Sequence, residues 1–227
     1  MNEKNKILNN IKKVKEEIRN ACKLAKVSEK NIKLVAVSKT IESTFICQAA
    51  MLGQISFGEN KVQEAIRKWP EIKKQYPKTV LHMIGPMQSN KVKDAIKIFD
   101  IIETLDREKI AVELKKNMNK SKNFPKIYVQ VNIGEEKQKH GCRPSEAKKF
   151  IRNCNEYGLN IKGVMAIPPY GENPAPYFAL LSNIAKESNI KNISMGMSKD
   201  FEMAIYLGAT SIRIGTKIFG ERKDGEI

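Results

Sequence analysis

A short apolar run followed by an amphipathic segment recurs along almost the whole chain. Each run except the last precedes apolar residues at helical spacing. Alternating strands and helices form parallel sheets, and eight units within 227 residues favour a closed (β/α)8 barrel of the TIM type. An open Rossmann-like sheet is disfavoured, because no GxGxxG motif follows the first run. The expected strands are Ile32–Val37, Gln54–Phe57, Thr79–Ile84, Asp100–Thr104, Lys126–Val131, Ile161–Ile167, Asn192–Met195 and Ser211–Ile214.

The first segment of the chain has its own helical pattern. Residues 1–28 are therefore expected to form an additional helix that packs on the barrel. No Pro-rich or Ser-rich linker divides the chain, so residues 1–227 are expected to form a single domain. No run approaches the roughly 20 apolar residues of a membrane span, and we expect a soluble, cytoplasmic protein without a membrane partner. The apolar positions of the first segment are Ile7, Ile11, Val14, Ile18 and Cys22.

The formal charge of +16 raises the alternative of a nucleic-acid-binding protein. Lysines recur on the polar face of nearly every expected helix, without interleaved aromatic residues or a basic tail. Solvated helix faces explain this charge better, and we expect no nucleic-acid partner. The four cysteines are scattered without a CxxC motif, and the two histidines lie far apart in the sequence. This distribution predicts reduced thiols and no metal site.

Functional residues in a barrel are expected on the loops that follow the carboxyl ends of the strands. The loops after the seventh and eighth strands commonly hold a phosphate, and here they carry Ser198 and Gly215-Thr216. Ser198 is expected at a helix N-cap, where free N–H groups favour an anion. Gly215 would let the backbone approach that anion closely, and Thr216 adds a hydroxyl. An ordinary cap and an ordinary turn are the alternative interpretation.

Arg213 alternates with Ile212 and Ile214, so it points into the barrel if the isoleucines face the helices. Its guanidinium needs an acceptor there, and a structural salt bridge with a carboxylate at the rim is the alternative to a ligand contact. Lys39 follows the first strand, which neighbours the eighth in a closed barrel, so its amine is expected near Arg213. An amine between apolar walls and beside another cation has a lowered pKa and attacks aldehydes. A phosphorylated aldehyde suits this site, and pyridoxal 5′-phosphate (PLP) is the candidate cofactor.

Seven motifs, in order and at strand ends, resemble those of the pyridoxal phosphate homeostasis proteins, whose fold is similar to the barrel domain of alanine racemase. The resemblance covers essentially the whole chain and implies a PLP-binding barrel. The motifs are AVSKT (Ala36–Thr40), FGENKVQEA (Phe57–Ala65), HMIGPMQSNK (His82–Lys91), QVNIGEEKQKHG (Gln130–Gly141), GVMAIPP (Gly163–Pro169), SMGMSKDFEMAI (Ser194–Ile205) and RIGTKIFGER (Arg213–Arg222).

The resemblance also implies roles for single residues. Lys39 looks like the Schiff-base lysine, and Arg213 looks like the residue that faces the pyridine nitrogen. The phosphate contacts implied are Ser198, Gly215 and Thr216, and Asn60 would line the same pocket. Two departures from the family pattern are visible: Leu81 and Met83 flank His82 where aromatic residues are frequent, and Glu103 replaces a frequent histidine.

The resemblance and the chemistry of Arg213 together favour a carrier over an enzyme. A permanent cation beside the pyridine nitrogen disfavours the protonated ring and weakens it as an electron sink. We therefore expect storage of PLP and its delivery to PLP-dependent apoenzymes, by a monomer, because nothing resembles a dedicated dimer helix. An amino-acid racemase is the alternative enzyme. It would need a second acid or base, such as Tyr170 or Tyr177, because the chain ends at Ile227 without room for a further β-domain.

Two further sets of titratable residues have expected roles. His82 alternates within a strand and is expected to be a hydrogen-bonded core residue, whereas His140 is expected to be solvated in a charged loop. The carboxylates of Glu59, Glu64, Glu135 and Glu136 could pair at the rim of the barrel, although nothing in the sequence fixes their separation.

Overall fold

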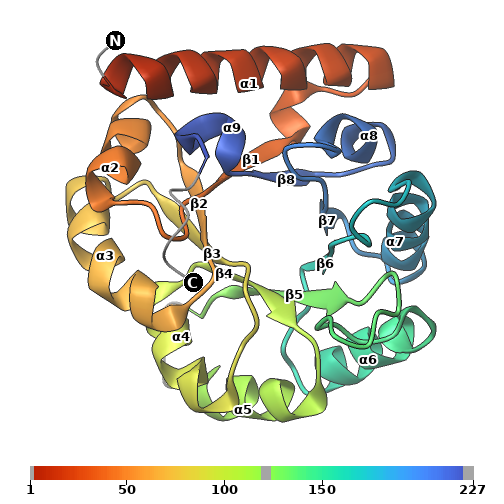
Figure 1. Cartoon of the computed structure of the whole chain (residues 1–227). Helices are drawn as coiled ribbons and strands as arrows, with labels where there is room; N and C mark the ends of the chain where they lie inside the picture. The colour runs from red at the N-terminus through yellow and green to blue at the C-terminus, as the bar shows by residue number, and fades with distance from the viewer. Residues whose placement is uncertain (1–2, 119–123, 222–227) are drawn as a thin grey trace.

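The computed structural model describes residues 3–118 and 124–221, and in these ranges the strands form a closed parallel barrel in chain order (Figure 1). The predicted (β/α)8 fold is confirmed. Arg222, the last residue of the seventh motif, lies outside the described ranges. The strands are β1 (Lys33–Val37), β2 (Ser56–Glu59), β3 (Val80–Met83), β4 (Ile101–Leu105), β5 (Lys126–Val131), β6 (Gly163–Ala166), β7 (Asn192–Ser194) and β8 (Ser211–Ile214).

The helices form a ring around the barrel, as Figure 1 shows. Two short 3-10 turns, η1 (Glu29–Asn31) and η2 (Ser89–Lys91), precede β1 and α4. The α-helices are α1 (Glu3–Ala25), α2 (Ser43–Met51), α3 (Val62–Gln75), α4 (Val92–Ile98), α5 (Glu108–Met118), α6 (Pro144–Glu156), α7 (Ala175–Glu187), α8 (Phe201–Tyr206) and α9 (Thr216–Phe219).

The barrel closes through parallel pairing of β1 with β8, in a register that sets Val35 opposite Arg213. Alternation along β8 behaves as predicted, because Ile212 and Ile214 are fully buried among the apolar side chains of the core, while Arg213 contacts groups from other strands. The carboxyl ends of the first and last strands are therefore neighbours, as the proposed site requires.

Helix α1 lies across α8 and α9 on the outside of the barrel (Figure 1). The five apolar positions predicted for its buried face are all at most 4% exposed. Asn10 Nδ2 donates to the Ile218 carbonyl at 2.9 Å, and Lys217 Nζ lies 2.6 Å from Glu17 Oε2. These contacts fasten the first helix to α9, the short helix that follows the last strand.

Most strands differ from their predicted bounds by one or two residues, and one helix was not predicted. Strand β2 begins at Ser56 rather than Gln54, because the Gln54 N–H completes the end of α2 by donating to the Ala49 carbonyl. Gly53, with φ of +85°, makes this turn possible. The second difference is α9, for which the sequence offered no helical period, since four residues are too few to show one.

Residues 3–118 and 124–221 contain no helix long and apolar enough to cross a membrane. Over the same ranges, no group of three or more His, Cys, Asp or Glu side chains is arranged to hold a metal ion. All four cysteines are free thiols, as predicted.

Candidate functional site

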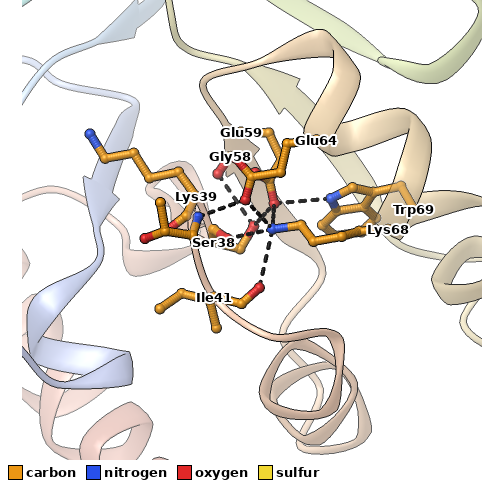
Figure 2. A network of polar contacts seen from close by, with 9 residues as sticks. Ser38, Lys39, Ile41, Gly58, Glu59, Glu64, Lys68 and Trp69 are labelled. Atoms are coloured by element: carbon orange, nitrogen blue, oxygen red, sulfur yellow. Dashed lines mark hydrogen bonds and ion pairs between the residues drawn. The ribbon is translucent and has the colours of Figure 1, made fainter. Parts of the chain in front are cut away.

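Lys39 is the second residue after β1, where the chain turns toward α2. Its neighbour Ser38 is fully buried, while Lys39 itself is half-buried. Thr40 has φ of +62°, a left-handed conformation that residues other than glycine rarely adopt. Figure 2 shows the Lys39 side chain extending away from a cluster of polar groups that lies behind this turn. The turn that carries the Lys39 amine therefore contains a rare left-handed residue, Thr40.

The centre of that cluster is the ammonium group of Lys68, on α3 (Figure 2). Lys68 Nζ lies 2.8 Å from Glu59 Oε1 and 2.8 Å from Glu64 Oε1. It also donates to the backbone carbonyls of Ser38, at 2.9 Å, and Ile41, at 3.2 Å. The side chain is 7% exposed, so these four oxygens replace the water that a buried ammonium needs. Lys68 thus joins α3 to the turn on both sides of Lys39.

Glu59, at the end of β2, connects the same cluster to the barrel. Its Oε1 accepts from Ser38 Oγ at 2.7 Å and from Trp69 Nε1 at 3.1 Å, in addition to its contact with Lys68. Burial raises the pKa of Glu59, and Lys68 and Ser38 offset only part of that shift. The Trp69 ring packs against Phe57 with 5.2 Å between ring centroids. The Glu59 carboxylate is consequently enclosed in the core.

The loops after β7 and β8 meet through two hydroxyls. Thr216 Oγ1 lies 3.2 Å from Ser198 Oγ, and both belong to residues that the sequence singled out. Gly215 packs against β1, because a Cβ added at Gly215 would lie 3.3 Å from the Cβ of Val37. Val37 comes two residues before Lys39. The structure therefore brings the two closing loops and the Lys39 turn to the same end of the barrel.

The predicted N-cap role of Ser198 is wrong. A turn spanning residues 198–200 intervenes, and Asp200 directly precedes α8. The Asp200 carboxylate accepts from the Met197 N–H at 2.5 Å, which stabilises this turn and moves the helix start beyond Ser198. Ser198 can contribute its hydroxyl beside Thr216, but it does not sit at the end of a helix dipole.

Arg213 lies inside the barrel and is 4% exposed. Its Nη1 donates to Ser194 Oγ at 2.6 Å, and its Nη2 donates to the Ala166 carbonyl at 2.8 Å. Glu103 Oε2 lies 3.9 Å from Nη1, so the salt bridge considered as an alternative does occur. The carboxylate is not at the rim, however, but in the middle of β4. Burial lowers the pKa of Arg213, and Glu103 counters that effect.

Glu103 is the hub of this second buried cluster. It accepts from Ser194 Oγ at 2.6 Å, and its Oε1 is hydrogen-bonded to His82 Nδ1 at 2.6 Å. Burial alone would raise the pKa of Glu103, but the bond with His82, the nearby Arg213 and Ser194 together hold that pKa below its ordinary value. His82 is thus a hydrogen-bonded core residue, as predicted. His140 is 54% exposed, in agreement with a largely solvated position.

Asn60 lies on the side of β1 opposite to β8, because β2 pairs with β1 there. It follows β2, and its backbone packs so closely against Gly85 that a Cβ there would lie 2.3 Å from the Asn60 carbonyl oxygen. Among the described residues, no hydrogen bond joins its side chain to the closing loops. The structure thus groups Lys39, Ser198, Arg213, Gly215 and Thr216 around β1, β7 and β8, and places Asn60 after β2, the other strand that pairs with β1.

Comparison with known proteins identifies the family. A family model described as the N-terminal domain of alanine racemase matches residues 7–223. The pyridoxal phosphate homeostasis protein of Aquifex aeolicus is 38% identical over 223 residues, which span 94% of this chain and 97% of that protein. This chain belongs to the pyridoxal phosphate homeostasis protein family.

Solved structures agree with that membership. PipY of Synechococcus elongatus, solved with PLP bound, matches with a TM-score of 0.77 at 31% sequence identity. The match covers 90% of this chain and 100% of the PipY chain. The PipY structure without PLP has a TM-score of 0.79 at 34% identity and covers 84% of this chain and 94% of PipY.

In this family member, sequence reasoning missed the importance of Lys68. The sequence left open whether Glu59 and Glu64 pair at the rim, and the structure joins both of them to this lysine. A signal was available: Lys68 follows Glu64 by four residues and immediately precedes Trp69 on the buried face of α3. A lysine beside a buried stripe needs acceptors, and two carboxylates were close in sequence.

The two tyrosines considered for a racemase differ in their surroundings. Tyr177 packs against the core, and its hydroxyl donates to Glu172. Tyr170 is 89% exposed and therefore does not pack as a buried aromatic residue. Its ring lies 5.5 Å from Lys199 Nζ, next to the Ser198 turn.

Proposed function

We propose that this protein binds PLP as a Schiff base on Lys39 and holds it for delivery to PLP-dependent apoenzymes. The observation that carries the proposal is the adjacency of the Lys39 turn to the paired hydroxyls of Ser198 and Thr216, across the β1–β8 seam. One end of the barrel thereby offers both an amine for an aldehyde and donors for a phosphate. Membership of the family and the PLP-bound structure of PipY support the choice of this cofactor.

The residues present fit a phosphorylated ligand. Ser198 and Thr216 supply two hydroxyl donors, and Gly215 has no side chain between its backbone and an incoming anion. The first N–H groups of α9 begin at Thr216, so they lie at the same place. These groups would hold the phosphate, while Lys39 would bond to the aldehyde carbon. Asn60, farther along the mouth, would line the pocket without touching the phosphate donors.

Arg213 supports a carrier rather than a catalyst. When bound, PLP supplies an aldehyde and, in enzymes, a ring that accepts electrons once its nitrogen is protonated. A protonated ring nitrogen needs a hydrogen-bond acceptor beside it. A guanidinium offers only donors and keeps its own positive charge, so it disfavours the protonated ring. Ser194, Ala166 and Glu103 hold Arg213 in place, so it would face the ring as a fixed cation. We further propose that residues 1–227 act as one cytoplasmic, monomeric binding unit.

A PLP titration of the purified protein, followed by visible absorbance, tests the proposal. We expect an imine band for the native chain and for Lys91→Ala, and no such band for Lys39→Ala. An unchanged band in Lys39→Ala would overturn the assignment of the Schiff base. Delivery is tested by mixing the loaded protein with an apoenzyme in the presence of a scavenger of free PLP. Recovery of enzyme activity is expected, whereas rapid α-proton exchange of an amino acid by the loaded protein would favour the racemase.

A further inference from the structure

We propose that Lys68 is the positioning residue for Lys39, acting through the backbone of the turn that carries it. The inference rests on the proposed function, because it assigns Lys68 a role toward the amine that binds PLP. Lys68 itself lies behind the turn, on the side opposite to the Lys39 side chain (Figure 2). It would therefore act on the geometry of Lys39 without touching the cofactor.

The Lys68 ammonium ties together the backbone on both sides of Lys39. It donates to the Ser38 carbonyl, one residue before Lys39, and to the Ile41 carbonyl, two residues after it. The Ile41 N–H also donates to the Ser38 carbonyl at 3.1 Å, which closes residues 38–41 into a turn. A single buried cation thus fixes both ends of the segment that presents the amine.

Glu64 extends this hold to the residue that follows Lys39. Its Oε1 accepts from Lys68 and also from the Thr40 N–H, at 2.7 Å. Thr40 is the residue with the left-handed backbone, a conformation that costs free energy for a threonine and needs surrounding contacts to persist. Side chains of helix α3 are therefore hydrogen-bonded to three backbone atoms of the turn: the Ser38 oxygen, the Thr40 nitrogen and the Ile41 oxygen.

Charge balance explains why a lysine can occupy this place. Two carboxylates, from Glu59 and Glu64, surround the Lys68 ammonium. The exposed fraction of the side chain is 7% for Lys68, 0% for Glu59 and 14% for Glu64. Removal of Lys68 would leave Glu59 and Glu64 without the cation between them, and it would remove one donor from the Ser38 carbonyl and the donor of the Ile41 carbonyl. The turn would then lose its fixed geometry before the barrel loses its fold, because the strand pairing of β1 does not depend on this contact.

The rate at which an amine bonds to an aldehyde depends strongly on how precisely the amine is positioned. Small misplacements of a reacting group cost large factors in rate, on the order of a hundredfold for about 1 Å. Lys39 would share its ligand with the donors Ser198 and Thr216, which follow β7 and β8, and a displaced turn would no longer match their positions. We therefore expect Lys68 to affect how fast and how completely PLP bonds to Lys39, more than it affects overall stability.

The test compares Lys68→Met, Lys68→Arg and the matched control Lys73→Met. Lys73, on the same helix, also joins a carboxylate and a carbonyl, those of Asp100 and Ile98, but it has no contact with the Lys39 turn. Each variant is titrated with PLP, its rate of imine formation is measured, and its melting temperature is recorded. We expect Lys68→Met to weaken PLP binding and slow imine formation by about tenfold or more, with partial recovery in Lys68→Arg. Lys73→Met is expected to retain native PLP binding whatever its melting temperature.

Glu64→Gln keeps the test decisive if Lys68→Met fails to fold. It keeps an acceptor oxygen for Thr40 but removes one charge beside Lys68, so we expect a smaller slowing of imine formation, about threefold. Native rates in Lys68→Met, or in Glu64→Gln where Lys68→Met is unfolded, would overturn the positioning role. That failure is distinguishable from failure of the proposed function, because an imine band that persists in Lys39→Ala refutes the proposed function directly.

Discussion

The hydroxyls of Ser198 and Thr216 are the proposed donors to the phosphate of PLP. Ser198 Oγ and Thr216 Oγ1 lie 3.2 Å apart, so a single phosphate could accept hydrogen bonds from both hydroxyls. We predict that Ser198→Ala and Thr216→Ala each weaken PLP binding by about tenfold, the loss of one hydrogen bond to a charged group. Binding of pyridoxal, which lacks the phosphate, should be unchanged. Equal losses for both ligands would show that the two hydroxyls do not hold the phosphate.

The lowered pKa of Glu103 predicts how the stability of the fold depends on pH. Its pKa in the folded protein is below its ordinary value of 4.5, so the carboxylate stabilises the fold at any pH above 4.5. This stabilisation is lost as pH falls from 4.5 through the lower folded pKa. Glu103→Gln should therefore be less stable than the native chain by about 3 kcal/mol at neutral pH, with the difference narrowing in acid. Urea unfolding between neutral and acidic pH measures it, and a constant difference would refute the assignment.

The residues that sequence reasoning found and those it missed differ in one physical respect. Lys39 and Arg213 could be placed because strand alternation and barrel closure fix where they point. Lys68 and Glu103 hold their places through partners far away in the sequence, such as Ile41 and Ser194. Apart from the spacing of four residues between Glu64 and Lys68, no local pattern encodes these contacts, so most of the two buried clusters emerged only from the structure.

At the scale of elements, α1 is a helix in which all five positions that the sequence predicted to be buried are buried. Ile11 on that face is 2% exposed, and Lys12 beside it points to solvent. Truncation of a buried isoleucine removes apolar contacts and leaves a cavity, so Ile11→Ala should lower the free energy of unfolding by about 3 kcal/mol. Lys12→Ala should change it by less than about 0.5 kcal/mol. Similar values for the two variants, measured by urea unfolding, would mean that α1 does not pack as described.

Short elements were harder to predict than long ones. The start of α8 was placed at Ser198, but a side-chain bond from the Met197 N–H to Asp200 moves it to Phe201. Helix α9 was missed because four residues carry no period. Both errors fall on the loops that the proposed phosphate site uses, where local hydrogen bonds outweigh periodicity.

At the scale of the whole molecule, the alternation of strands and helices was sufficient to predict the closed barrel. Closure matters for function because it sets β1 beside β8, and thus joins residues separated by most of the chain. The charge of +16 says less about function, because it is spread along the whole sequence. The absence of a nucleic-acid partner stays a prediction, and tight, salt-sensitive binding of a DNA duplex would contradict it.

The most direct test of the account is chemical trapping of the loaded protein. Borohydride reduction converts a Schiff base into a stable amine, and digestion followed by mass spectrometry locates the labelled lysine. We predict a single pyridoxyl group, on the peptide that contains Lys39. A label on another lysine, or no label at all, would contradict the claim that this barrel holds PLP through Lys39.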